Sequence, residues 1–175
     1  VDEYKNFIAG LTNVNISNAE LDSTTYEAAE FRFMKGDCEA SIKDFTDYLL
    51  KYPNGFFKLN ASFYRAECLY KKGDQAKALE DYAFIISQPK NIFTEKSLIK
   101  AADINYKSKN YSEALTSYIK LQEVSEVPYN IVMAIAGQLK CNYLLKDYKS
   151  SIRSAGTLLS MEKVPADIQQ EAHLI

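Results

Sequence analysis

The stretch AECLYKKGDQAKALEDYAFIISQP, residues 66–89, decides the fold of this chain. It holds two amphipathic segments that are joined by Gly73 and Asp74, and it ends at Pro89. Glycine tolerates the left-handed backbone that ends a helix, and the aspartate after it can cap the next helix. Proline cannot continue a helix, so it ends the second segment. The stretch therefore predicts two helices joined by a tight turn.

The same turn recurs along the chain. Gly36, Gly73, Lys109 and Lys146 mark it at spacings of 37, 36 and 37 residues, and each is followed by Asp or Asn. A fixed period in this range indicates stacked helix pairs, each of which buries its apolar face against its neighbours. Lysine in place of glycine leaves the geometry of the last two turns open.

The helices of the predicted pairs share residue types in columns. Each second helix has a small residue, and positions i+4 and i+7 from it lie on the same helix face. These positions hold larger residues except in the fourth unit, where Ala155 replaces the aromatic residue at i+4. In chain order these are Ser41, Phe45 and Tyr48; Ala78, Tyr82 and Ile85; Ala114, Tyr118 and Leu121; Ser151, Ala155 and Leu158. The first helices share an aromatic column, which consists of Phe33, Tyr70, Tyr106 and Tyr143. All four prolines of the chain follow second helices: Pro53, Pro89, Pro128 and Pro165.

These units resemble tetratricopeptide repeats, whose pattern is a small residue and an aromatic before a Gly-Asp turn, then Ala, an aromatic and Pro. Residues 66–89 match the pattern best, and the resemblance covers about residues 25–165. It implies an all-α fold: a right-handed α-solenoid of antiparallel helix pairs that coils into a superhelix. In character the chain is similar to repeat segments of long bacterial envelope-associated proteins of this family, which would place it in the periplasm.

The predicted organisation is a row of repeats with incomplete units at both ends. Residues 1–24 are expected to hold the second helix of a preceding repeat and a connecting loop, since Tyr4, Phe7, Ile8 and Leu11 follow helical spacing. Repeats 1 to 4 span 25–55, 56–90, 91–128 and 129–165, and residues 166–175 are the first helix of a truncated fifth repeat. Terminal repeats normally carry polar capping faces, so we expect a fragment of a larger protein.

Composition argues against several function classes. The chain has 21 Lys and Arg against 23 Asp and Glu, spread along its length, so we expect no nucleic acid partner and leave room for a local basic patch only. No stretch approaches the roughly 20 apolar residues that cross a bilayer, so no direct membrane insertion is expected. We predict no metal, no cofactor and no enzyme, because no catalytic constellation or Cys/His cluster can be assembled.

Three cysteines and one histidine are present. Cys68 and Cys141 occupy equivalent positions in the repeat and are expected to act as small core residues. Cys38 lies at the start of a helix, where the helix dipole can lower a thiol pKa, but no basic partner for it is identifiable. The odd number of cysteines excludes a disulfide-dense scaffold.

The resemblance implies a binding surface, since first helices line the concave groove of a tetratricopeptide array. The transferred groove positions are Tyr26, Glu30, Phe33, Met34, Phe63, Glu67, Tyr70, Lys71, Asp103, Tyr106, Lys107, Lys140 and Tyr143. Their aromatic rings could stack on an extended or helical peptide, and three carboxylates could attract its Lys or Arg side chains. Alternatively, the aromatic column packs between units and the acidic column is a solvated helix face. A clamp for a peptide C-terminal carboxylate, which is known in the family, does not suit an acidic groove.

The sequence therefore predicts a non-catalytic protein–protein interaction scaffold that binds a protein or peptide in its groove. Two alternatives stay open: an architectural spacer within a larger repeat protein, and a module that binds glycan or peptidoglycan fragments through its 13 Tyr and 9 Phe. End-to-end self-association of the fragment is also expected, because incomplete terminal repeats would expose apolar seams.

Overall fold

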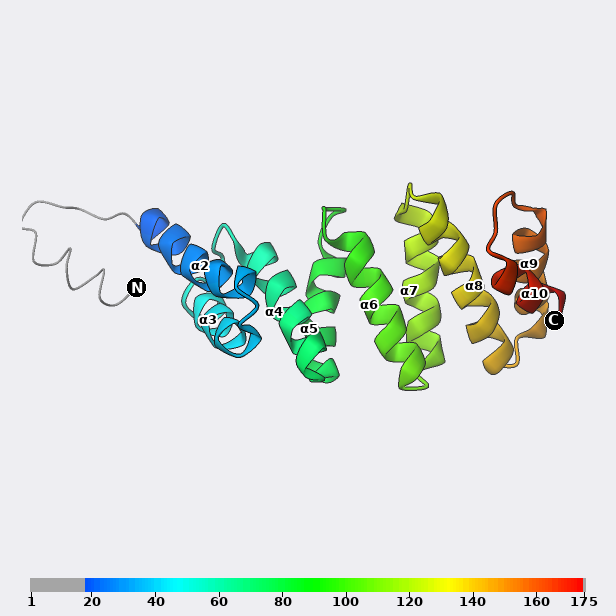
Figure 1. Cartoon of the computed structure of the whole chain (residues 1–175), viewed down its shortest axis with the longest axis horizontal. Coiled ribbons are helices and arrows are strands. Elements are labelled where there is room, and N and C mark those ends of the chain that lie inside the picture. The colour runs from blue at the N-terminus through cyan, green and yellow to red at the C-terminus, as the bar shows by residue number, and fades with distance from the viewer. Residues whose placement is uncertain (1–17, 175) are drawn as a thin grey trace, which may run out of the picture. The chain divides into compact units, whose positions relative to one another are not determined.

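The structure is a computed structural model that describes residues 18–174. Over this range the chain is all-helical, with nine helices and no strand (Figure 1). The helices are α2 (Asn18–Met34), α3 (Cys38–Lys51), α4 (Lys58–Lys72), α5 (Gln75–Ser87), α6 (Thr94–Lys107), α7 (Tyr111–Val124), α8 (Pro128–Leu144), α9 (Tyr148–Ser160) and α10 (Ala166–His173). The helix predicted around Tyr4 to Leu11 lies outside the described residues.

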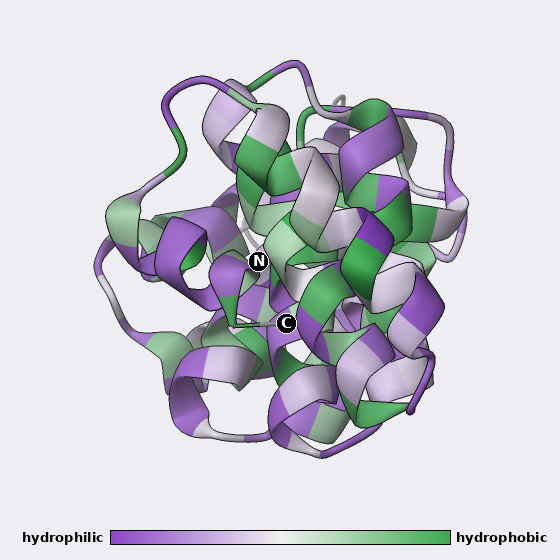
Figure 2. Ribbon diagram, turned by 90° about the vertical axis from the view of Figure 1, so that its right-hand side faces the viewer, coloured by the Kyte–Doolittle hydropathy of each residue, from purple (hydrophilic) through white to green (hydrophobic). Residues whose placement is uncertain are grey.

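Neighbouring helices along the chain pack on one another, as in α2 on α3, α3 on α4, and α6 through α10 in succession. This confirms an all-helical architecture in which packing is sequential, while the handedness of a superhelix stays a prediction. The chain divides into two compact units, residues 1–85 and 86–175, with the boundary in α5. Figure 2 shows hydrophobic and hydrophilic segments alternating along the helices, as expected of amphipathic helices that bury one face.

The core of unit 1 is aromatic. Tyr26 of α2 stacks on Phe57 with ring centroids 4.3 Å apart, and it also contacts the rings of Phe45 and Tyr48 on α3. The fully buried Tyr48 donates a hydrogen bond to Asp22 of α2, and its hydroxyl accepts one from the Phe57 backbone N–H at 3.1 Å. This network ties α2 and α3 to the start of α4.

Helix α2 begins at Asn18, whereas the sequence analysis placed residues 18–24 in a connecting loop. Polar side chains in this part of α2 are satisfied inside the helix. The hydroxyls of Thr24 and Thr25 donate to the carbonyls four residues earlier, at 2.7 Å and 2.6 Å. Asp22 accepts hydrogen bonds from the Tyr48 hydroxyl of α3 and from the Phe56 backbone N–H before α4, and local sequence reveals neither partner.

All four predicted turns have the same left-handed backbone. Gly36 and Gly73 have φ of 79° and 86°, and Lys109 and Lys146 adopt the same region at 63° and 64°. In each turn the next residue's N–H bonds a carbonyl five residues earlier: Asp37 to Arg32, Asp74 to Leu69, Asn110 to Asn105, Asp147 to Asn142. Such a bond satisfies a helix-end carbonyl that would otherwise lack a partner. The lysines thus occupy a glycine conformation, at a cost of about 1 kcal/mol each.

Three of the four predicted caps form side-chain hydrogen bonds. Asp37, Asp74 and Asp147 each accept from a backbone N–H three residues later, at 3.1 to 3.3 Å. Asn110 makes no such bond, so its cap is limited to the backbone. Hydrogen bonds from Lys77 and from Ser150 hold the pKa of Asp74 and of Asp147 below its ordinary value.

We expect Lys146→Gly to raise the free energy of unfolding by about 1 kcal/mol, because glycine adopts positive φ without strain. Gly73→Ala should lower it by a similar amount through the backbone alone, since a Cβ there meets nothing within 4 Å. Urea unfolding followed by circular dichroism measures both. A lower midpoint for Lys146→Gly would contradict the strain argument.

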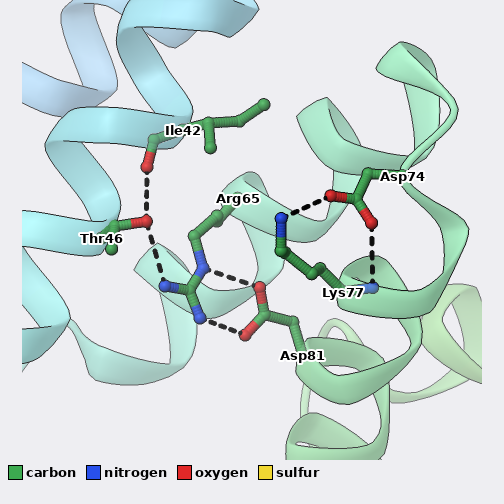
Figure 3. Close-up of polar contacts among 6 residues, drawn as sticks. All are labelled: Ile42, Thr46, Arg65, Asp74, Lys77 and Asp81. Atoms are coloured by element: carbon green, nitrogen blue, oxygen red, sulfur yellow. Dashed lines mark hydrogen bonds and ion pairs between the residues drawn. The ribbon is translucent and has the colours of Figure 1, made fainter.

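Unit 1 also contains a buried ion pair. Arg65 of α4 makes two bonds to Asp81 of α5, at 2.8 Å and 2.7 Å, and a third to Thr46 of α3 at 3.2 Å (Figure 3). The side chain of Asp81 is 7 % exposed and that of Arg65 is 23 % exposed. Burial raises the pKa of Asp81, and the Arg65 guanidinium opposes that rise. One side chain therefore joins three consecutive helices.

Arg65→Ala should lower the stability of unit 1 by about 3–5 kcal/mol at neutral pH, because it leaves a buried carboxylate without its partner. The pKa of Asp81 in the folded chain then rises further. A carboxyl whose pKa is raised by folding destabilises the folded chain above that pKa, and this cost disappears once the carboxyl is protonated. The destabilisation should therefore shrink as the pH falls through that raised value. The double variant Arg65→Met/Asp81→Leu is the control and should cost much less. Urea titrations at several pH values test this, and a loss that does not change with pH would contradict it.

A disulfide joins Cys38, at the start of α3, to Cys68 in α4, with their Cα atoms 5.0 Å apart. The expectation that Cys68 is only a small core residue was therefore wrong. Closing a loop with a sequence separation of 30 contributes about 3–4 kcal/mol in the chain-entropy account. Cys141, the equivalent of Cys68, is free and fully buried, and burial raises its thiol pKa to about 11.

Candidate functional site

The predicted groove residues lie on the first helices α2, α4, α6 and α8. Two of them are core residues. Tyr26 is 3 % exposed and stacks on Phe57, and Phe63 is 5 % exposed and contacts Tyr64 edge-on. Because both rings are buried, their role in this structure is packing, and the prediction that they face a ligand is corrected.

The acidic residues of unit 1 in the predicted groove are partnered inside the unit. Glu30 accepts a hydrogen bond from the Tyr26 hydroxyl at 2.6 Å, and Glu67 accepts one from the Tyr82 hydroxyl at 2.7 Å. Burial, and then these carboxylates, raise the pKa of both tyrosines. Tyr82 is fully buried, so its bond to Glu67 links α4 to α5 through the core. These carboxylates therefore have a structural use whether or not a ligand binds.

The charged groove positions of unit 2 are paired as well. Asp103 lies 2.8 Å from the ammonium of Lys107, one turn later on α6. Lys140 of α8 lies 2.9 Å from a carboxylate oxygen of Glu171 on α10. The acidic column therefore does not present a row of carboxylates without partners to a ligand, which removes the main electrostatic argument for capture of Lys or Arg.

The other aromatic groove positions differ in exposure. Phe33 is half-buried and stacks on Tyr64 of α4, with centroids 4.6 Å apart, and Tyr70 is half-buried too. Tyr143 is 50 % exposed and meets Tyr148 edge-on across the α8–α9 turn. Met34 and Lys71 are exposed. The predicted aromatic ladder is thus part packing and part surface.

Three predicted residues do come together, around a cavity of about 320 Å³ in unit 2. Tyr106 from α6 and Lys140 and Tyr143 from α8 line it. The remaining lining residues are Leu139, Leu144, Glu171 and Leu174. The aromatic rings and leucines give it apolar walls, and the Lys140–Glu171 ion pair supplies the polar group. This cavity is the candidate functional site.

The electrostatics of the cavity follow from this pairing. Partial burial raises the pKa of the Tyr106 phenol, while the nearby Lys140 ammonium opposes the rise. The tyrosine therefore stays neutral at physiological pH and can donate or accept a hydrogen bond. The lining combines apolar walls with one ion pair, a mixture that is common in ligand pockets.

The contribution of α10 to the cavity was not predicted from the sequence. Glu171 and Leu174 line the cavity from the helix predicted to open a fifth repeat. The signal was present, because first helices of successive repeats lie side by side and α10 therefore follows α8. Leu139 and Leu144 were missed because only every third or fourth position of α8 was transferred.

A cleft in unit 1 is lined by none of the residues that were predicted to form the binding groove. It has a volume of about 330 Å³ and lies between α2 and α3, where Arg32, Lys43, Asp44 and Asp47 are among its lining residues. Arg32 pairs with Asp44 and Lys43 with Asp47, both at 2.9 Å. The first pair joins α2 to α3, and the second joins successive turns of α3. The charged side chains of the cleft therefore have structural partners, and the cleft is not taken as a candidate site.

Within residues 18–174, no group of three or more His, Cys, Asp and Glu residues is arranged to hold a metal ion. Over the same range no helix has the length and apolar character needed to cross a membrane. A comparison with known protein-family models finds none that matches the chain, and a search of curated proteins returns no relative.

We expect Tyr82→Phe to lower the free energy of unfolding by about 1–3 kcal/mol, because Glu67 loses a buried donor. Tyr143→Phe is the matched control, since it removes an exposed hydroxyl and should change stability by less than about 0.5 kcal/mol. Denaturant unfolding compares the two variants. Equal, small effects would mean that Glu67 has no structural role.

Proposed function

We propose that this chain is a non-catalytic scaffold of the tetratricopeptide kind that binds a protein or peptide partner, with the cavity of unit 2 as the contact site. The proposal is supported by four turns of the same backbone geometry at a period of 36 to 37 residues. The observation that carries it is that Tyr106, Lys140 and Tyr143, transferred from the repeat pattern alone, line one cavity.

The lining suggests which ligand group enters. A volume of about 320 Å³ with two tyrosines and three leucines fits one or two large apolar side chains. The Lys140–Glu171 pair offers both a donor and acceptors, so it can bind the backbone amides beside such a side chain. The expected ligand is therefore a peptide segment with an aromatic or aliphatic anchor, and a net positive charge on it is not required.

Unit 1 favours the second candidate function, an architectural spacer. Its acidic groove positions Glu30 and Glu67 are bound to tyrosines, and its helices are cross-linked by the Cys38–Cys68 disulfide and the Arg65–Asp81 pair. Such a unit resists deformation without needing a ligand. We infer that unit 1 serves as a spacer within a longer repeat protein, whereas ligand contact is a property of unit 2.

The disulfide also bears on the compartment. Disulfides persist in oxidising surroundings and are rare in the reducing cytosol. The Cys38–Cys68 bond therefore favours an oxidising compartment, and the periplasm proposed from the resemblance to bacterial envelope proteins is one of these.

Selection of a peptide library against the whole chain tests the proposed function. Enriched peptides should share an apolar anchor, and Tyr106→Ala/Tyr143→Ala should weaken their binding at least about tenfold, as expected for truncated anchor contacts. Tyr129→Ala is the control, because Tyr129 is exposed on α8 and does not line this cavity. Calorimetry with each variant measures the affinity.

Peptides that bind wild type and the double variant equally would place the contact outside the cavity. Failure to enrich any peptide would favour the spacer function for the whole chain. A titration with peptidoglycan fragments, followed by tyrosine fluorescence, is the arm that tests the glycan alternative. Binding there, lost in the double variant, would replace a peptide with a glycan as the ligand of the same cavity.

A further inference from the structure

Two turns of unit 2 lie next to each other along one edge. Helices α6 and α8 end there, and the α6–α7 and α8–α9 turns both lie at the lower edge of Figure 1. Their proximity is fixed by the cavity, because Tyr106 near the end of α6 and Leu144 at the end of α8 line it together. We call residues 106–113 and 143–153 the turn edge.

Each turn of this edge holds a lysine in a strained backbone conformation. Lys109 and Lys146 have φ of 63° and 64°, where the equivalent turns of unit 1 have Gly36 and Gly73. Both lysines are exposed, and neither forms an ion pair with another described residue. A cation is thus kept at the tip of each turn although glycine would fit the backbone better.

The turn edge is cationic on a chain whose formal net charge is −2. Lys107 is paired with Asp103, and four further cations remain: Lys109, Lys146, Lys149 and Arg153. Two carboxylates oppose them, Glu113 and Asp147, and Asp147 is engaged in capping α9 through the N–H of Ser150. The local excess is therefore positive, in contrast to the whole chain.

Apolar side chains surround these cations. Around the α8–α9 turn, Tyr143, Leu144, Leu145, Tyr148 and Ile152 are all between 41 % and 58 % exposed. Tyrosines also face each other edge-on across both turns, with centroids 5.6 Å apart for Tyr106 and Tyr111 and 5.7 Å for Tyr143 and Tyr148. Tyrosine, leucine and lysine side chains on one exposed edge are the mixture that favours a membrane–water interface.

We propose that the turn edge docks peripherally on an anionic lipid bilayer. Lys109, Lys146, Lys149 and Arg153 contact lipid phosphates, and the exposed side chains of Leu145, Tyr148 and Ile152 enter the interfacial layer. A bilayer suits this edge better than an acidic peptide, because Lys109 and Lys146 stand on two turns and Lys149 and Arg153 on the start of α9, and none of them lines a groove described in unit 2. A broad anionic surface can touch both turns at once. None of these seven residues lines the cavity of the candidate site.

Cosedimentation with vesicles tests the proposal, using the whole chain. Vesicles of equal parts phosphatidylcholine and phosphatidylglycerol should bind it, pure phosphatidylcholine vesicles should not, and added salt should release it. Lys109→Gly/Lys146→Gly should weaken binding about 30-fold, at roughly fivefold per lysine near an anionic surface. Because both substitutions relieve backbone strain, loss of binding in this variant cannot come from unfolding.

Lys163→Gly is the matched control. Lys163 also has positive φ, at 60°, and lies in the loop after α9, at the end of that helix opposite the α8–α9 turn. The same change of charge and backbone there should leave vesicle binding unchanged. An equal loss with Lys163→Gly, or no loss with the double variant, would overturn the assignment to the turn edge.

A fluorescent probe separates lipid from other anions. The chain has no Trp, so Leu145→Trp reports on one position, and its emission should shift to the blue and be quenched by brominated acyl chains. Binding to poly-glutamate that matches or exceeds binding to the anionic vesicles would overturn the proposal in favour of an acidic protein partner. Release by soluble glycerol phosphate at low concentration would likewise show that a free phosphate, not a bilayer, is the ligand.

Discussion

The helix pairs of this chain depend on one backbone constraint, a residue held at positive φ between two helices. That residue reverses the chain within two or three positions and lets the next N–H bond a carbonyl of the helix that is ending. The following helix can then pack on the first, as α7 does on α6 and α9 does on α8. Because the turn fixes where each helix ends, it also fixes which side chains reach the neighbouring helix.

The repeat period of 36 to 37 residues predicted the positions of the turns, because the backbone constraint at each turn depends on adjacent residues. Gly73 and Asp74 are adjacent in sequence, so their effect on the backbone needs no distant partner. The start of α2 and the Cys38–Cys68 disulfide could not be predicted in the same way, because the first depends on Tyr48 of α3 and the second joins different helices. In hindsight, the spacing of Cys38 and Cys68 places them in adjacent repeats, but Cys141 occupies the position equivalent to Cys68 with no cysteine to pair with.

For the candidate site, too, some features follow from the sequence and others depend on partners that the sequence does not show. Repeat alignment gives the helix and the register of a residue, and three residues transferred in this way, Tyr106, Lys140 and Tyr143, line one cavity. It does not give the partner of a side chain, and so Glu67 was predicted to face a ligand although Tyr82 binds it. The function of polar residues is the hardest to predict in this way, because a carboxylate on a helix surface and one bonded to a buried hydroxyl look alike in sequence.

The disulfide gives the first repeats a mechanical property that the later ones lack. If the chain is pulled from its two ends, the segment between Cys38 and Cys68 carries no load, because tension passes through the sulfur atoms. Its sequence separation of 30 means that about 100 Å of extended chain is withheld from stretching. The interface of α3 with α4 would therefore remain joined under forces that separate α7 from α8.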